Sequence, residues 1–184
     1  MILKQMLLYS KFLLEQIICE GDTAIDATVG NGHDTLFLSN LVGETGKVYG
    51  FDIQQQAIDK VKELNIKNAC LICDGHQNID LYVTEQVAGV IFNLGYLPSG
   101  DHSITTTADT TTVAISKILD ILKTNGLIVL IVYHGHKGGK EERDGLLNFV
   151  QNLDQKRVSV LKYEFINQKN DAPFIIALEK LKNY

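Results

Sequence analysis

Apolar and polar positions along this chain alternate in blocks that predict strands and helices in turn. Helical spacing of apolar residues predicts helices over residues 35–41, 54–64, 107–122 and 141–153. Shorter apolar runs predict strands over residues 23–28, 48–53, 69–73, 87–94, 127–133, 158–166 and 174–178. The run at 87–94 is apolar enough for a strand that is covered on both faces.

Strands that alternate with helices indicate a parallel sheet with right-handed crossover connections. Residues 167–173 join the last two strands without a helix, which predicts a terminal antiparallel pair. The chain has no internal repeat, low-complexity segment or linker. We therefore expect one α/β domain over residues 1–184.

The first eighteen residues carry apolar side chains at helical spacing, at Leu3, Met6, Leu7, Leu14, Ile17 and Ile18. Charged residues interrupt this segment, and no small-residue cleavage site follows it. The segment therefore predicts an amphipathic helix that covers part of the core, not a signal peptide. No window of the chain is long and apolar enough to predict a membrane span.

Composition limits the class of protein further. The chain has 184 residues, 45% of them hydrophobic, and its three cysteines are an odd number, which argues against a disulfide framework. Cys70 and Cys73 have the spacing of a redox or metal pair, but in a strand residues three apart point to opposite faces. We interpret them as small buried hydrophobic residues, and expect no metal site and a reduced, cytoplasmic protein.

The net charge of −5 argues mildly against nucleic acid as a partner, because phosphate binding depends on basic surface. A local basic group on an acidic protein would meet that objection. The candidates are Lys137 with Lys140, or Lys156 with Arg157 and Lys162; scattered solvated cations are the alternative interpretation.

The first strand runs into a glycine-containing loop, Asp26-Ala-Thr-Val-Gly30-Asn-Gly32-His-Asp34. Gly30 and Gly32 allow a sharp turn and close approach to a ligand, and the helix that follows offers free N–H groups to an anion. Asp52 ends the next strand, where a carboxylate can bind ribose hydroxyls. This pattern predicts an adenosine-containing cofactor; a plain strand–turn–helix is the alternative.

Two features favour S-adenosylmethionine over a dinucleotide. A dinucleotide loop places a third glycine at position 35, where this chain has Thr35. Asp26 stands just before the loop, where a carboxylate suits the ammonium and sulfonium groups of S-adenosylmethionine. After the third strand, the Asp74 carboxylate can accept a hydrogen bond from the adenine amine, unless it only caps a turn.

These motifs resemble those of a known family. Asp26-Ala-Thr-Val-Gly-Asn-Gly-His-Asp-Thr35, Phe51-Asp-Ile-Gln54, Gly75-His-Gln77, Asn93-Leu-Gly-Tyr-Leu-Pro98 and Tyr133-His-Gly-His136 are similar to the rRNA methylase family of class I S-adenosylmethionine-dependent methyltransferases. The resemblance implies a Rossmann-like, seven-stranded, mostly parallel sheet with an antiparallel last strand and helices on both faces. It also implies a cofactor site made of Asp26, Gly30, Asn31, Gly32, Asp34, Asp52, Ile53, Asp74, Gly75, His76 and Asn93.

Asn93-Leu-Gly-Tyr96 ends the fourth strand, where amine methyltransferases carry an Asn-Pro-Pro-Tyr type of motif. The Asn93 side-chain oxygen and the next backbone carbonyls can accept the hydrogens of an amine, so that its lone pair is directed at the methyl group. Tyr96 can stack on an unpaired base. Leu94 and Gly95 replace the two prolines, which puts the rigidity of this loop in doubt; a strand-ending turn is the alternative.

A primary amine is mostly protonated at neutral pH, so the site needs a proton acceptor. His102 and His134 are the candidates, and His136 lies close to the latter in the sequence. We therefore expect Asn93, Tyr96, His102 and His134 to act in catalysis. A surface role is the alternative for each histidine.

Members of the family that are similar to this chain act on tRNA, and the resemblance therefore implies a substrate. It predicts methylation of the amine of 5-aminomethyl-(2-thio)uridine at the wobble position of a tRNA anticodon loop. The alternatives are an rRNA or small-molecule amine methyltransferase, a nicotinamide oxidoreductase and a non-catalytic adenosine-ligand binding module. Because the chain is short for RNA binding, a homodimer is a further expectation.

Overall fold

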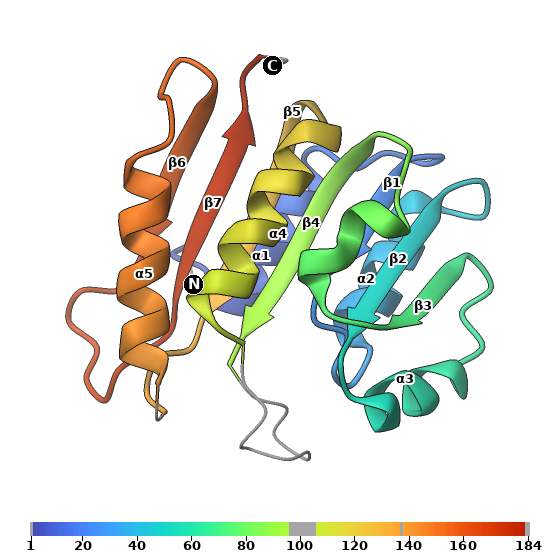
Figure 1. Ribbon diagram of the computed structural model, residues 1–184, viewed down its shortest axis with the longest axis horizontal. Coiled ribbons are helices and arrows are strands. Elements are labelled where there is room, and N and C mark those ends of the chain that lie inside the picture. Colours follow the sequence, from blue (N-terminus) through green and yellow to red (C-terminus); the bar gives the residue numbers. More distant parts are fainter. Residues whose placement is uncertain (1, 96–105, 137, 183–184) are drawn as a thin grey trace.

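The computed structural model describes residues 2–95, 106–136 and 138–182, which form a seven-stranded sheet with helices on both faces (Figure 1). From β3 to β5, neighbouring strands are parallel, whereas β7 is antiparallel to both β5 and β6. The mixed sheet expected from the sequence is therefore confirmed. In sheet order the strands are β3 (Ala69–Cys73), β2 (Lys47–Asp52), β1 (Thr23–Asp26), β4 (Val87–Leu94), β5 (Leu122–Val132), β7 (Phe174–Lys180) and β6 (Val158–Tyr163).

Helices α1 (Met6–Glu15) and α2 (His33–Val42) cover one face of the sheet, and α3 (Gln55–Lys62) flanks β2 and β3. The other face is covered by α4 (Ala108–Ile121), α5 (Gly139–Gln151) and the 3-10 helix η1 (His76–Leu81) (Figure 1). Successive side chains of a strand point to opposite faces, so β4 contributes to two cores. Phe92 packs on the α4 side and Ile91 on the α1 side, as expected for a strand covered twice.

Four strands differ in length from the prediction: β1 ends at Asp26 instead of residue 28, β7 ends at Lys180 instead of residue 178, and β5 and β6 differ most. β5 begins at Leu122 instead of residue 127, because Leu122 already pairs with Val87 before the register shifts to Gly89 and Leu127. β6 ends at Tyr163 instead of residue 166, where its pairing with β7 ends. Apolar runs alone do not reveal such irregularities, because pairing depends on the neighbouring strand.

The prediction that Cys70 and Cys73 are buried is wrong. Cys19, Cys70 and Cys73 are free and exposed. Cys70 and Cys73 lie on β3, which is an edge strand with a neighbour on one side only. The first helix also buries less than expected: Met6 and Leu14 reach the core, whereas Leu3 and Leu7 are exposed.

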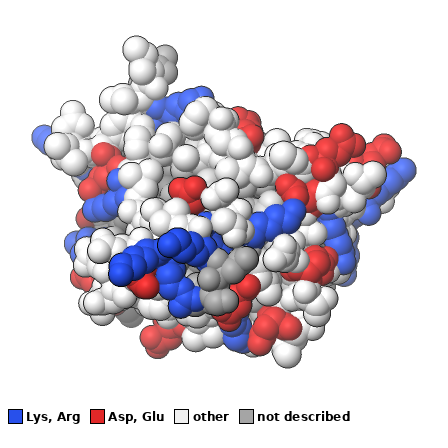
Figure 2. All heavy atoms as spheres, turned by 90° about the horizontal axis from the view of Figure 1, so that it is seen from above, with Lys and Arg blue, Asp and Glu red and all other residues white. Residues whose placement is uncertain are grey.

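Lys and Arg side chains gather on the face where the parallel strands begin, with acidic side chains between them (Figure 2). Lys156 and Arg157 precede β6, in the connection that Figure 1 places at this end. The loops after β1, β2 and β4 lie at the opposite end of the sheet. Lys156 and Arg157, which the sequence offered as part of a local basic group, therefore lie far from those loops.

Within the described parts of the chain, no helix is long and apolar enough to cross a membrane. Nor do three or more His, Cys, Asp or Glu side chains of these residues come together as metal ligands would.

Asp26, the last residue of β1, is completely buried and supports the loop that follows. Its Oδ1 accepts the Thr28 N–H at 3.2 Å, and its Oδ2 accepts the Thr35 hydroxyl at 2.6 Å. Thr35, at the position where a dinucleotide loop has glycine, thus holds the buried Asp26 carboxylate through its hydroxyl group. Burial and the nearby Asp34 carboxylate raise the pKa of Asp26 to about 7, although these two hydrogen bonds oppose the change.

The raised pKa of Asp26 makes stability depend on pH. In the folded protein the Asp26 carboxyl is protonated below about pH 7, whereas in the unfolded chain it is protonated only below about pH 3.8. Lowering the pH from 8 to 5 should therefore raise the free energy of unfolding by on the order of 2 kcal/mol through this group. Asp26→Asn preserves the shape of the side chain and should lose that part of the pH dependence. Urea denaturation at both pH values measures it, and equal pH dependence in both proteins would contradict the prediction.

Candidate active site

A cleft of about 880 Å³ opens where β1, β2, β3 and β4 end. Because β1 pairs with β2 on one side and β4 on the other, the loops that follow β1 and β4 separate and leave a crevice between them. Most residues predicted to bind a cofactor line this cleft: Gly30, Asn31, Asp34, Asp52, Ile53, Asp74, Gly75, His76 and Asn93.

Asp26 and Gly32 are the two predicted cofactor residues that do not line the cleft. Asp26 lies beneath the loop, as described above. Gly32 caps the amino end of α2 with a φ of 80°, and a side chain there would come within 2.7 Å of Val61 on α3. Glycine is therefore needed at position 32 for the turn and for packing against α3.

Asp52 connects the loop after β1 to the end of β2. Its Oδ2 accepts the Gly30 N–H at 2.9 Å, and its Oδ1 accepts the Gln54 N–H at 2.9 Å. Ile53 follows with about half of its side chain exposed at the cleft. A carboxylate and an apolar side chain therefore stand next to each other on this wall, which suits a ligand with hydroxyls and a flat ring.

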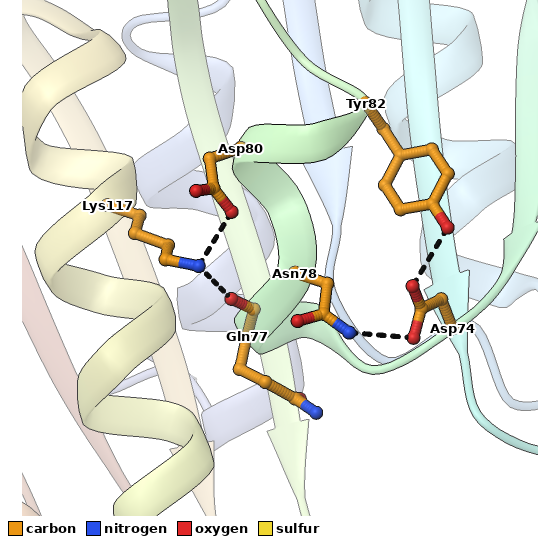
Figure 3. Close-up of polar contacts among 6 residues, drawn as sticks. All are labelled: Asp74, Gln77, Asn78, Asp80, Tyr82 and Lys117. Carbon is orange, nitrogen blue, oxygen red and sulfur yellow. Dashed lines mark hydrogen bonds and ion pairs between the residues drawn. The ribbon is translucent and has the colours of Figure 1, made fainter.

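Asp74 is held in place by side chains of the η1 segment (Figure 3). Its Oδ1 accepts from Asn78 at 2.9 Å and its Oδ2 from the Tyr82 hydroxyl at 2.8 Å, and these hydrogen bonds lower the pKa of the carboxyl group. Lys117 of α4 anchors η1 itself, donating to the Gln77 carbonyl and to Asp80, each at 2.6 Å. Asp74 is thus ionised and fixed at the wall.

His76 lines the cleft but is almost completely buried. Its Nδ1 lies 3.2 Å from the Ala27 carbonyl, which can only accept, so Nδ1 carries the hydrogen and Nε2 is an acceptor. Nε2 has no hydrogen-bond partner among the described residues. Burial lowers the pKa of His76, so the ring is neutral near pH 7.

Asn93 is tied to the loop after β1 by its backbone and its side chain. Its N–H donates to the Thr28 hydroxyl oxygen at 2.7 Å, and its Nδ2 donates to Asp34 Oδ2 at 2.6 Å. A carboxylate only accepts, so Asp34 fixes the orientation of the Asn93 amide. Asn93 Oδ1 is left as an acceptor at the cleft, with no donor among the described residues.

The carbonyls that follow Asn93 are less available than the sequence suggested. The Leu94 carbonyl accepts the Tyr133 N–H at 3.3 Å, and the Gly95 carbonyl accepts the Thr106 N–H at 3.1 Å. Each oxygen retains one lone pair for a ligand. The amide oxygen of Asn93 is therefore the less encumbered acceptor at the end of β4.

Of the other predicted catalytic residues, Tyr96 and His102 lie outside the described residues. Lys137, a candidate for the basic group, also lies outside them. His134 lines the cleft, and its ring packs edge-on against Phe174 with 5.5 Å between ring centroids. Burial, with a contribution from the charge of Arg143, lowers the pKa of His134.

Sequence patterns missed several residues at this cleft. Leu7 and Lys11 reach it from α1, and Lys11 lies 3.6 Å from Asp34. Tyr133 also lines it, about one third exposed, and burial and the Asp34 charge raise its pKa. Helical spacing placed Leu7 and Lys11 on α1 but not beside the loop after β1, because that contact forms only in the folded chain.

The cleft fits S-adenosylmethionine in size and charge. Its volume is near the upper end for small-ligand sites, about 300–1,000 Å³, which leaves room for an acceptor group beside the cofactor. Asp34, Asp52 and Asp74 line it, and Asp26 lies just beneath. An acidic site of this kind favours a ligand that carries ammonium and sulfonium charges.

Comparisons with known proteins agree with this geometry. The family model described as "Putative rRNA methylase" matches residues 48–179. The chain is 38% identical to the chloroplastic tRNA (mnm(5)s(2)U34)-methyltransferase of Arabidopsis thaliana, over 92% of this chain and 67% of that protein.

Two crystal structures are similar over nearly the whole chain. One, from Clostridium thermocellum, is described as a putative rRNA-methylase; it is 47% identical, with a TM-score of 0.94, and the match covers 97% of this chain and 99% of that one. The other, SMU.1697c from Streptococcus mutans, is described as a putative methyltransferase in complex with SAH; it is 47% identical over the same shares, with a TM-score of 0.89. The chain belongs to the rRNA methylase family and is an S-adenosylmethionine-dependent methyltransferase.

Proposed function

We propose that this enzyme methylates RNA, and that its substrate is the amine of 5-aminomethyl-(2-thio)uridine at the wobble position of tRNA. The observation that carries the proposal is the orientation of Asn93. Asn93 lines the cleft, and with Nδ2 bound to Asp34 its Oδ1 is left as a hydrogen-bond acceptor that has no donor among the described residues. A hydrogen-bond acceptor at this position suits a methylated nitrogen that bears hydrogens, because it can accept one of its N–H groups. It offers no such contact to a carbon nucleophile.

Cofactor binding is assigned to the wall formed by the loops after β1, β2 and β3. The amino end of α2 suits the carboxylate of the cofactor, and Asp34 suits its ammonium group. Asp52 suits the ribose hydroxyls, and Asp74 with Ile53 suits the adenine. S-adenosylmethionine supplies a methyl group on an electrophilic sulfonium. Asp26 supports the loop from below without a direct contact, and its raised pKa of about 7 means that it is fully charged only above that pH.

The acceptor amine is assigned to the end of β4. Asn93 Oδ1 would accept one N–H of the amine, so that its lone pair is directed across the cleft towards the methyl group. Tyr133 lines the cleft near Asp34 and is placed to stack on an extruded base, the role that the sequence gave to Tyr96.

Support for tRNA comes from the Arabidopsis relative, whose name specifies a tRNA wobble nucleoside, and from the edge of the cleft. Lys11 lines the cleft, Lys60 donates to Asn31 at 2.7 Å, and Lys140 lies 3.8 Å from Asp171, which also lines it. These cations are placed to meet a phosphate backbone beside a flipped-out base.

The role of Asp52 is tested by Asp52→Ala, which should weaken S-adenosylmethionine binding by about 1–3 kcal/mol, because a charged hydrogen-bond partner is lost. Asp59→Ala is the control, since Asp59 is an exposed carboxylate of the neighbouring α3 that pairs with Lys62. Titration calorimetry with both variants measures the difference. Unchanged affinity in a folded Asp52→Ala protein would remove Asp52 from the cofactor site.

The role of Asn93 is tested by Asn93→Ala, which should lower kcat by about 100-fold or more with little change in cofactor affinity, because the contact is needed near the transition state. Asp34→Asn should cause a smaller loss of kcat in the same assay, since the Asn93 amide can then adopt either orientation. Full turnover by Asn93→Ala at saturating substrate would show that Asn93 is structural.

The substrate is tested by nucleoside mass spectrometry of tRNA from cells that lack the gene. The unmethylated 5-aminomethyl nucleoside should accumulate, and purified enzyme with S-adenosylmethionine should convert it to the 5-methylaminomethyl form in that tRNA. Ribosomal RNA from the same cells is the control substrate. Methylation of rRNA without methylation of tRNA would show that the proposed substrate is wrong and that the enzyme acts on rRNA.

A further inference from the structure

The Asp74 carboxylate keeps one hydrogen-bonding position for a ligand. Its Oδ1 accepts the Gly75 N–H at 2.7 Å and the Asn78 amide at 2.9 Å, which uses both lone pairs of that oxygen. Its Oδ2 accepts the Tyr82 hydroxyl at 2.8 Å and keeps one lone pair. Because Asp74 lines the cleft, this remaining position suits one N–H of an exocyclic amine. A ring without that amine would leave it unused.

Tyr82 and Asn78 are themselves held by the fold. The Tyr82 ring packs edge-on against the buried Phe51 of β2, with 5.7 Å between ring centroids. Asn78 lies at a kink inside η1, where its φ of −99° and ψ of 15° are not helical. The two side chains therefore reach Asp74 from the middle and from the end of one segment, and the position of that segment decides where the carboxylate lies.

Lys117 of α4 holds η1 on both sides of this kink. Because its Nζ donates to the Gln77 carbonyl and to Asp80 Oδ1, each at 2.6 Å, one cation joins the residues before and after Asn78 (Figure 3). Between them, Ile79 is completely buried in the same core as the apolar side chains of α4. Apolar packing and charged hydrogen bonds therefore attach η1 to α4.

We propose that Asn78 and Tyr82 are positioning residues which, by holding Asp74, make the cofactor site select a purine with a 6-amino group. Lys117 extends this role to α4, because it holds η1 from the side opposite to Asp74 (Figure 3). A carboxylate that is fixed before the ligand arrives does not have to be ordered on binding, so more of the hydrogen-bond energy appears as affinity. The inference rests on the assignment of Asp74 to the adenine in the proposed function.

The first test compares S-adenosylhomocysteine with its analogue that has hydrogen in place of the 6-amino group, by titration calorimetry. The analogue should bind the parent protein about 10–100-fold more weakly, as expected when a hydrogen bond to a charged group is lost. In the double variant Tyr82→Phe, Asn78→Ala, this ratio of dissociation constants should fall to about 3-fold or less, because Asp74 is no longer held. A parent-like ratio in the double variant would overturn the proposal.

Tyr49→Phe is the matched control, because the Tyr49 hydroxyl also donates to a carboxylate, that of Glu85, at 2.8 Å, and should leave both affinities unchanged. Asp74→Ala separates the inference from the assignment on which it rests. If Asp74→Ala keeps the parent ratio, Asp74 does not bind the amine, and the assignment and the inference both fail. If Asp74→Ala loses the ratio while the double variant keeps it, the assignment stands and the positioning role fails.

The role of Lys117 is tested in the same titrations. Lys117→Met should lower the ratio about 3-fold or more, and Lys117→Arg should restore it, because a guanidinium group can still donate to a carbonyl and a carboxylate. Partial unfolding weakens both ligands by the same factor, so the ratio reports on the site and not on stability. Lys123→Met, which removes an ion pair with Asp22, is the control and should keep the parent ratio. A parent-like ratio in Lys117→Met would overturn the role of Lys117.

Discussion

The position of β1 in the sheet is the constraint on which the site depends. β1 lies between β2 and β4, although the chain returns to β4 only after passing through β2 and β3. The loops after β1 and β4 therefore leave adjacent strand ends in different directions and open the cleft between them. The residues that are assigned to contact the cofactor or the acceptor amine lie at strand ends, in loops or at a helix end that border this opening.

Hydrogen bonds across the opening fix the loop after β1 and the end of β4 relative to each other. Thr28 and Asp34 hold the backbone and the side chain of Asn93 from the loop after β1. Methyl transfer needs the nucleophile and the methyl group in line, so a fixed distance between these two segments matters more than the rigidity of either one. This explains how Leu94 and Gly95 can replace the prolines found in other amine methyltransferases, because tertiary contacts provide the constraint.

In the described part of its chain the protein buries two carboxylates, Asp26 and Glu142, and burying each costs folding free energy. Asp26 has a pKa raised to about 7, and burial raises the pKa of Glu142 as well. Such groups lower stability, but Asp26 lies beneath a site that suits a cationic cofactor.

The sequence by itself determined the order of strands and helices, the glycine loop after β1, and the carboxylates Asp52 and Asp74 at strand ends. Periodicity and strand ends are local features, so they can be recognised without the fold. Only the tertiary structure decided that Asp26 lies beneath the cleft, that the cysteines on β3 are exposed, and that Asp34 orients Asn93 across 59 positions of the chain. Burial and amide orientation depend on which distant segments pack together, and no local pattern records that.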